Sequence, residues 1–462
     1  MIDFESKLTQ WEQDPKRVRI DGPGGKVSNA DFVARVRARA AEFARLKVGA
    51  RSMVALATGR GPDFLSDLVA VWLRGAVAVP YPPDGAEHLH SVARPTVLID
   101  DELRDCGTAR QDTRIPDDTA VILFTSGSSG EPKGVVLSRH SVFGNAAAAV
   151  AALPIRADDR LLVNTPFHFT SSICHFLATI VSNATLIAVE DKCFPHELVS
   201  CTRRYGATAF GGAPIQVRWL GEGLDPSEPL RWWMSSGDHM PEHVVRQLTT
   251  RFPDTSLHVF YGLTEVGGRF CSLPASQCTT LAGSVGVPIR GMSLSVRDDN
   301  GRVLPPGVSG EVFASGEYLM TGYLQDNACP PPGPHGFATG DLGHHDGDGN
   351  LQLLGRADDV FKVAGQKVSG HRIAAALMET GLFDDAAVVP IDDEKLGTVP
   401  GACVVPRTNP LEKGPLLQAL RKRLPPNAMP RKFFSLESIP RTGSGKVKTA
   451  GLRALLENAS TL

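Results

Sequence analysis

Short apolar runs alternate with amphipathic segments along the chain, and this alternation restricts the possible folds more than any other feature. Residues 53–57 and 76–80 are typical of buried strands, and residues 62–74 between them are typical of a helix. The same rhythm recurs around residues 121–124, 141–152, 160–164, 172–182 and 184–189. It predicts an α/β protein built on largely parallel sheets.

The pattern changes in the second half of the chain, and one helix near the start can be predicted in detail. From about residue 283, short runs at 283–295, 302–315 and 351–354 are punctuated by Gly and Pro, which indicates a β-rich subdomain. After residue 355 the pattern is again mixed α/β. Near the start, Ser28 and Asp31 predict the N-cap of an amphipathic helix, with Phe32, Val36, Ala40 and Phe43 on one face and Arg35, Arg39 and Arg45 exposed to solvent.

Composition excludes several classes of protein. The 462 residues amount to about three domains, and 48 Lys and Arg balance 50 Asp and Glu. A net charge of −2 argues against a nucleic-acid-binding or membrane-surface protein. The eight cysteines form no CxxC pair, the N-terminus lacks the apolar core of a signal peptide, and no apolar run reaches membrane-spanning length. We therefore expect a cytoplasmic location.

The densest chemical signal follows the predicted strand at 121–124. A loop there contains Thr125, Ser126, Gly127, Ser128, Ser129, Gly130, Lys133 and Gly134. Glycines let backbone N–H groups approach an anion, hydroxyl groups donate further hydrogen bonds, and lysine adds a positive charge. The pattern therefore favours a polyphosphate ligand. It is not the loop of P-loop NTPases, because Lys133 is followed by Gly134 and not by Ser or Thr.

Residues 123–134, LFTSGSSGEPKG, resemble the signature loop of the ANL superfamily of adenylate-forming enzymes. That superfamily includes acyl- and aryl-CoA synthetases, adenylation domains of nonribosomal peptide synthetases, and luciferases. Further segments resemble its other motifs in the same order, over residues about 30–455: PFHFTSS at 166–172, YGLTE at 261–265, TGDL at 339–342, GRADDVFKVAG at 355–365 and PRTGSGK at 440–446.

The resemblance implies a fold and a division of the chain. A large N-terminal AMP-binding domain of two α/β sheet layers and a β-rich subdomain would cover residues 1–354. A small mobile α+β C-terminal domain would cover residues 355–462. Gly310, Glu311, Val312, Gly316, Gly322 and Tyr323 also match a family signature, which we interpret as packing and turns.

The resemblance also implies roles for individual residues. The hydroxyl groups and glycines of residues 125–130 and Lys133 would bind the ATP phosphates, and Lys446 would be the adenylation lysine. His168 would border the substrate carboxylate, Tyr261 would stack on adenine, Thr264 would contact phosphate, and Glu265 would hold Mg²⁺. Asp341 would bind the ribose, Arg356 the nucleotide, and Asp358 would be the hinge. The acid pocket would be formed by Ser171, Ser172, Gly211, Gly212, Ala213, Pro214, Ser236 and Gly237.

The implied function is ATP-dependent activation of a carboxylic acid to an acyl-adenylate, followed by transfer to the pantetheine thiol of coenzyme A. The alternative acceptor is an acyl or aryl carrier protein, whose acidic surface would suit the basic runs at 421–423 and 431–432. A non-catalytic scaffold of the same fold would be expected to have lost Lys446, Glu265 or Asp341, and all three are present.

Three departures from the family pattern refine this hypothesis. Thr170 stands where amino-acid-activating members carry an Asp for the substrate ammonium. A buried ammonium without a carboxylate would be unpaired, so an aromatic or short acyl acid is favoured over an α-amino acid. After the hinge, Gly370 and Arg372 replace the usual Pro and Glu. This difference could change the start of the next helix or the face that binds the thiol. The portion before the hinge is also short for the family.

Overall fold

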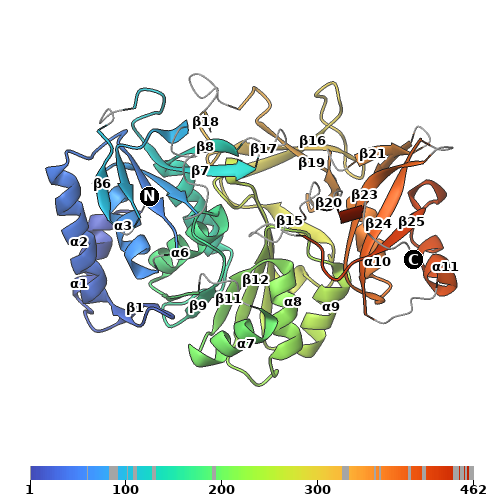
Figure 1. The fold of residues 1–462 in the computed structure, drawn as a ribbon, viewed down its shortest axis with the longest axis horizontal. Coiled ribbons are helices and arrows are strands. Elements are labelled where there is room, and N and C mark those ends of the chain that lie inside the picture. Colours follow the sequence, from blue (N-terminus) through green and yellow to red (C-terminus); the bar gives the residue numbers. More distant parts are fainter. Residues whose placement is uncertain are drawn as a thin grey trace. The chain divides into compact units, whose positions relative to one another are not determined.

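The computed structural model describes residues 2–59, 61–82, 92–100, 102–107, 112–126, 132–189, 194–324, 332–357, 360–363, 366–393, 397–407, 413–440, 447, 452 and 455–456 (Figure 1). The described chain divides into two compact units. The first comprises residues 1–240, 244–294 and 314–337, and the second comprises residues 241–243, 295–313 and 338–462.

The first unit contains a seven-stranded sheet in the order β18-β8-β7-β4-β3-β5-β6. Its central strands β7, β4, β3 and β5 are parallel, and β8, β18 and β6 are antiparallel to their neighbours. The strands are β3 (Met53–Ala57), β4 (Val77–Tyr81), β5 (Val97–Ile99), β6 (Leu103–Asp105), β7 (Thr119–Ser126), β8 (Pro132–Ser138) and β18 (Gly322–Tyr323). Helices α1 (Phe4–Glu12), α2 (Asn29–Arg45) and α3 (Pro62–Leu73) pack against one another beside it.

A second sheet in this unit runs β15-β14-β13-β12-β11-β9-β10-β1-β2, and its strands from β13 to β1 are parallel. Its strands are β1 (Val18–Asp21), β2 (Val27–Ser28), β9 (Arg160–Val163), β10 (Thr185–Ala188), β11 (Ala209–Gly212), β12 (Trp232–Ser236), β13 (Ser256–Tyr261), β14 (Cys271–Leu273) and β15 (Ser284–Pro288). Between them lie a π-helical turn (His140–Gly144) and helices α5 (Asn145–Ala151), α6 (Thr170–Ser182), α7 (Pro195–Arg204), α8 (Pro214–Gly223) and α9 (Glu242–Arg251). The predicted alternation of strands and helices is confirmed.

The second unit includes the antiparallel pair β19 (Phe337–His345) and β20 (Leu351–Arg356). These strands follow β16 (Met292–Arg297) and β17 (Gly310–Gly316) in sheet order, as expected for a β-rich subdomain. Toward the C-terminus come the hairpin β21 (Val360–Val363) and β22 (Gln366–Ser369), helices α10 (Gly370–Met378) and α11 (Lys413–Arg421), and a sheet of β23 (Phe383–Asp393), β24 (Gly397–Pro406) and β25 (Lys432–Ser435).

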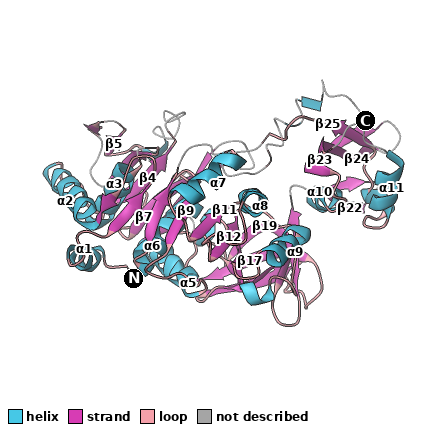
Figure 2. Ribbon diagram, turned by 90° about the horizontal axis from the view of Figure 1, so that it is seen from below, coloured by secondary structure: helices cyan, strands magenta, loops and turns pink. Residues whose placement is uncertain are grey.

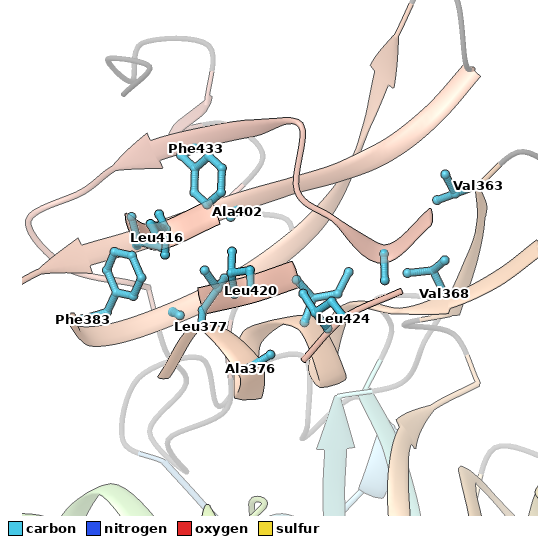
Figure 3. Close-up of a cluster of buried hydrophobic side chains, with 14 residues drawn as sticks. Val363, Val368, Ala376, Leu377, Phe383, Ala402, Leu416, Leu420, Leu424 and Phe433 are labelled. Carbon is cyan, nitrogen blue, oxygen red and sulfur yellow. The ribbon is translucent and has the colours of Figure 1, made fainter. Parts of the chain in front are cut away.

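One face of this C-terminal sheet packs on α10 and α11 (Figures 2 and 3). Alternation along β24 explains the arrangement, because Ala402 and Val404 face the helices whereas Cys403 packs in a separate cluster with Phe434 and Leu452. The buried residues between sheet and helices are Val363, Val368, Ile373, Ala376, Leu377, Phe383, Ala386, Ala402, Val404, Leu416, Leu420, Leu424, Ala428 and Phe433. The Gly370 and Arg372 departures leave the helix start intact, because the Ser369 hydroxyl accepts a hydrogen bond from the Arg372 backbone N–H at 3.3 Å.

Helix α2 confirms the predicted N-cap and corrects the predicted arginine face. Ser28 accepts a hydrogen bond from the Asp31 backbone N–H at 3.1 Å, and the four predicted apolar side chains are buried. Arg39, however, is not simply solvated, since its Nε lies 2.6 Å from the Asp67 carboxylate on α3, whose side chain is only 3% exposed. Arg35 pairs with Asp63 in a geometry that leaves both side chains largely exposed.

These two pairs give a matched test of packing between α2 and α3. We expect Arg39→Met to lower the free energy of unfolding by about 2 kcal/mol, because it removes a charged hydrogen bond from a buried carboxylate. Arg35→Met is the control, with an expected loss below about 1 kcal/mol. Urea unfolding of both variants measures the difference, and equal losses would contradict the assignment.

Candidate active site

The carboxyl ends of four parallel strands bring ten residues of the predicted site together. Strands β9, β11, β12 and β13 pair in parallel and end at Val163, Gly212, Ser236 and Tyr261. The segments that follow these ends therefore leave from one edge of the sheet, where open α/β sheets bind ligands. The predicted residues placed at this edge or just beyond it are His168, Gly211, Gly212, Ala213, Pro214, Ser236, Gly237, Tyr261, Thr264 and Glu265.

The turn after β13 depends on close backbone packing. A side chain at Gly262 would place its Cβ 1.9 Å from the Gly268 carbonyl oxygen, so the turn admits only glycine there. Thr264 begins a short 3₁₀ helix (Thr264–Val266), and its hydroxyl lies 2.7 Å from that of Thr170 at the start of α6. The turn thus couples the YGLTE segment directly to the PFHFTSS segment.

Tyr323 connects the turn to the predicted phosphate loop. Its hydroxyl donates to Glu265 Oε1 at 3.1 Å, and the Lys133 ammonium lies 5.1 Å from the centroid of its ring. The Met320 backbone N–H donates to the Glu265 carbonyl at 2.7 Å, which fixes the backbone of the same residue. The sequence had indicated only a packing role for Tyr323, because its partners are about 60 and 190 residues away in the chain.

Two paired strands contain the described residues of the predicted phosphate loop. Strands β7 and β8 are antiparallel, with Thr125 opposite Lys133 and Ser126 opposite Pro132. The hairpin thus places the predicted hydroxyl of Thr125 and the Lys133 stem in neighbouring strands. Six of the predicted residues lie outside the described part of the chain, namely Gly127, Ser128, Ser129, Gly130, Asp358 and Lys446.

His168 is held between two neighbours. Its Nδ1 lies 3.3 Å from the Thr58 hydroxyl, and its ring centroid lies 4.2 Å from that of Phe169. Burial lowers the pKa of His168 from 6.5 to about 4, because the charged imidazolium would lose its hydration. His168 is therefore neutral at physiological pH and can accept or donate a hydrogen bond without carrying charge.

The predicted pocket residues on α6 and β11 are tightly packed. Ser172 is fully buried and donates to the Thr165 carbonyl at 2.7 Å, whereas Ser171 is partly exposed. A Cβ at Gly211 would lie 2.4 Å from His175 Nε2, so the glycine makes room for that imidazole. At Gly212 a Cβ would lie 2.5 Å from Gln216 Oε1.

In the second unit, the predicted ribose and nucleotide residues are neighbours. Asp341 and Arg356 are opposite each other on β19 and β20, with Asp341 Oδ1 3.6 Å from Arg356 Nη1. The Arg356 guanidinium also donates to the Thr339 carbonyl at 3.3 Å. Asp341 is only 8% exposed, so the pair holds a carboxylate in a fixed position where it can accept hydrogen bonds.

The described residues contain neither a cluster of metal ligands nor a candidate membrane span. Within that part of the chain, no group of three or more His, Cys, Asp or Glu side chains is arranged to hold a metal ion. A single carboxylate such as Glu265 suits Mg²⁺, which usually takes one or two protein ligands and completes its shell with water and substrate phosphates. Among the described helices, none is long and apolar enough to cross a membrane.

Two family models match the chain. The model of the AMP-binding enzyme family matches residues 8–324, and that of the AMP-binding enzyme C-terminal domain matches residues 372–446. The chain belongs to the AMP-binding enzyme family. The first of these matches spans strands β3 to β13 and the YGLTE turn.

Two of the relatives are named as CoA ligases. The chain is 30% identical to 2-succinylbenzoate–CoA ligase of Bacillus cereus (strain AH820) over 73% of this chain and 70% of that protein. It is 27% identical to indoleacetate–CoA ligase of Aromatoleum aromaticum, covering 97% and 98% of the two chains. It also matches tyrocidine synthase 3 of Brevibacillus parabrevis at 26% identity, spanning only 7% of that protein.

A solved structure shows the same fold. The o-succinylbenzoate CoA synthetase of Bacillus subtilis, in complex with an acyl-adenylate intermediate, superposes with a TM-score of 0.83 at 22% identity and 97% coverage of both chains.

The burial of His168 leads to a pH prediction. Its folded-state pKa of about 4 lies below the unfolded value, so the unfolded chain takes up the proton first as pH falls. This histidine therefore contributes stability that is present above about pH 6.5 and is lost as pH falls toward 4. NMR titration should show its imidazole unprotonated at pH 5.5, with His168→Gln identifying the resonance by its absence. A midpoint near 6.5 would contradict the prediction.

Proposed function

We propose that the chain activates a carboxylic acid with ATP, forming an acyl-adenylate and pyrophosphate, and then transfers the acyl group to the thiol of coenzyme A. The observation that carries this proposal is the position of Tyr323. Its hydroxyl donates to the Glu265 carboxylate, and its ring lies under the ammonium of Lys133 in the β7–β8 hairpin. A positioned carboxylate and a lysine next to a Gly/Ser loop suit a nucleotide with its magnesium ion. Relatives named as CoA ligases support the same reaction.

In the first half-reaction, a substrate carboxylate oxygen attacks the α-phosphorus of ATP, and the bond to pyrophosphate breaks. The chain's contribution is to position the reactants and to stabilise developing negative charge. Lys133, the hydroxyl of Thr125 and the glycines of residues 127–130 would bind phosphate oxygens, and Glu265 would hold Mg²⁺, which neutralises phosphate charge when bound. Asp341 would accept hydrogen bonds from the ribose, and Arg356 would bind the nucleotide.

In the second half-reaction, a thiolate attacks the acyl carbonyl and AMP leaves. We propose that the portion after residue 354 reorients about Asp358 between the two steps, withdrawing Lys446 and admitting the pantetheine arm. Hinges of this kind consist of a few residues that absorb a change in backbone angles.

The acid is proposed to be aromatic or short acyl and not an α-amino acid. The hydroxyl of Thr170 contacts that of Thr264 at 2.7 Å, so a neutral hydroxyl stands where an ammonium would need a carboxylate. The relatives that act on 2-succinylbenzoate and indoleacetate, both aromatic acids, favour this class.

A carrier protein is the alternative thiol donor. Arg421, Lys422, Arg431 and Lys432 are exposed, which would suit either an acidic carrier surface or the phosphates of coenzyme A. Thioester formation should be compared with coenzyme A and with phosphopantetheinylated carrier proteins as acceptors. A cytoplasmic location, where ATP, Mg²⁺ and coenzyme A are present, is part of the same proposal.

The proposed role of Lys446 predicts that its loss affects adenylation but not thioester formation. Lys446→Ala should reduce ATP–pyrophosphate exchange by at least about 100-fold, because the positive charge that stabilises the transferring phosphate is lost. The same variant should still form thioester from a synthetic acyl-adenylate, which bypasses the first half-reaction. Exchange measured with labelled pyrophosphate checks this, and Lys422→Ala, on the exposed surface, is the control.

The whole proposal is tested by a pyrophosphate-release screen over aromatic, short-chain and hydroxy acids. Turnover of at least one acid, dependent on ATP and Mg²⁺, is expected. If every acid failed with well-folded protein, the proposed activation would be wrong. If exchange by Lys446→Ala remained near the wild-type rate, only the assignment of that residue would be wrong.

A further inference from the structure

Arg269 is a buried cation that pairs with no carboxylate of the described residues. It follows the YGLTE turn, is 3% exposed, and lies with its guanidinium carbon 5.7 Å from the centroid of the Phe260 ring. Its Nη2 lies 3.2 Å from Nε2 of the equally buried His175. Within the described part of the chain, no Asp or Glu forms an ion pair with it.

This arrangement is costly unless a ligand completes it. Burial lowers the pKa of Arg269, which reflects the loss of hydration around its charge. A charge removed from water without a counter-charge is strongly destabilising. Asp159, a buried ion of the same unit, differs in having a charged partner, since it accepts hydrogen bonds from Arg231 and Trp232.

His175 acts as a neutral support for the guanidinium. Both burial and the charge of Arg269 lower the pKa of His175, so Nε2 accepts a hydrogen bond from the arginine and Nδ1 carries the proton. His175 Nδ1 is buried without a hydrogen-bond partner in the described structure. The Nδ1–H of His175 is therefore a second buried donor, beside the Arg269 guanidinium, without an acceptor among the described residues.

The position of Arg269 is fixed independently of its side chain. Asn145 accepts from the Arg269 backbone N–H at 3.0 Å and donates to its carbonyl at 2.6 Å. His175, its side-chain partner, packs against Gly211 at the end of β11. At Gly268 a Cβ would lie 3.0 Å from Thr170 Cγ2, so Arg269 begins beside the start of α6. These are the elements of the predicted acid pocket.

We propose that Arg269 binds a second carboxylate of the substrate, so that the acid activated by this protein is a dicarboxylate. The inference rests on the proposed activation of a carboxylic acid. The reacting carboxylate must reach the end of the turn at Thr264 and Glu265, whereas Arg269 follows Gly268 at the other end. A planar guanidinium matches a carboxylate with two parallel hydrogen bonds, and the pairing would neutralise the buried charge.

The same geometry explains how a monocarboxylate would be rejected. Arg269 is already buried without a ligand, so an acid that lacks the second carboxylate would leave this charge unpaired and would not gain the binding energy of the ion pair. Sites built to bind a polar group discriminate strongly against analogues that lack it, by up to about 10⁴-fold. Arg269 is thus a specificity-determining residue rather than a catalytic one.

The test uses pairs of acids that differ by one carboxylate: succinate against butyrate, glutarate against pentanoate, and phthalate against benzoate. For at least one pair, we expect wild-type kcat/KM in pyrophosphate release to favour the dicarboxylate by about 100-fold or more. Arg269→Met should reduce that ratio to near 1 or below, and Arg269→Lys should restore part of it. An unchanged ratio in Arg269→Met, or wild-type preference for monocarboxylates throughout, would overturn the inference.

A buried arginine elsewhere supplies the control. Arg19 is 1% exposed, and its guanidinium donates to the Asn29 side chain and the Ala184 carbonyl, so its role is structural. Arg19→Met should lower the melting temperature and leave the ratio unchanged. Arg269→Met should leave the melting temperature equal or higher, because it removes an unpaired buried charge. A fall in melting temperature with equal losses for both acids would show that Arg269 is merely structural.

Binding without ATP separates this inference from the proposed activation. The dicarboxylates alone should raise the wild-type melting temperature but not that of Arg269→Met. If this shift occurred while no acid released pyrophosphate, the second-carboxylate site would stand and the proposed activation would fail. If monocarboxylates released pyrophosphate and Arg269→Met changed nothing, the activation would stand and the second-carboxylate site would fail.

Discussion

Parallel pairing of β9, β11, β12 and β13 is the constraint on which the rest of the site depends. Because these strands run in one direction, the segments after them all leave from one edge of the sheet. Side chains from residues 164–265 thereby come together without any of them having to be adjacent in sequence. The turn at residues 261–268 then fixes Thr264 and Glu265 against α6 and β18, because Gly262 and Gly268 allow a backbone contact that no side chain would permit.

Local patterns in the sequence predicted the local features of this structure. The N-cap at Ser28 and the buried face of α2 depend on residues within one helix, and both were predictable from spacing alone. The phosphate-loop, YGLTE and TGDL motifs could be recognised because each is contiguous, although residues 127–130 of the first lie outside the described part of the chain. Arg39 differs because its partner Asp67 lies on another helix, and a helical pattern gives no information about the charge opposite it.

The residues that sequence reasoning missed all depend on long-range contacts. Tyr323 contacts the predicted site because β18 pairs with β8, which brings its ring to Lys133 and its hydroxyl to Glu265. Arg269 looks like an ordinary surface residue in sequence, and only its burial against His175 and Phe260 shows an uncompensated charge. One signal for this residue was present in the sequence. Arg269 is a charged residue five positions after Thr264, in a segment rich in glycine and apolar residues.

No carboxylate among the described residues pairs with Arg269, and this agrees with what recognition of an anionic substrate would require. A resident Asp or Glu would neutralise the guanidinium and compete with an anionic substrate for the same hydrogen bonds. A neutral imidazole can orient the guanidinium without cancelling its charge, and the Asn145 hydrogen bonds fix the backbone without using the side chain. The unpaired charge of Arg269 lowers the stability of the free protein. An anionic substrate group that pairs with it would remove this cost, and the gain would appear as binding energy.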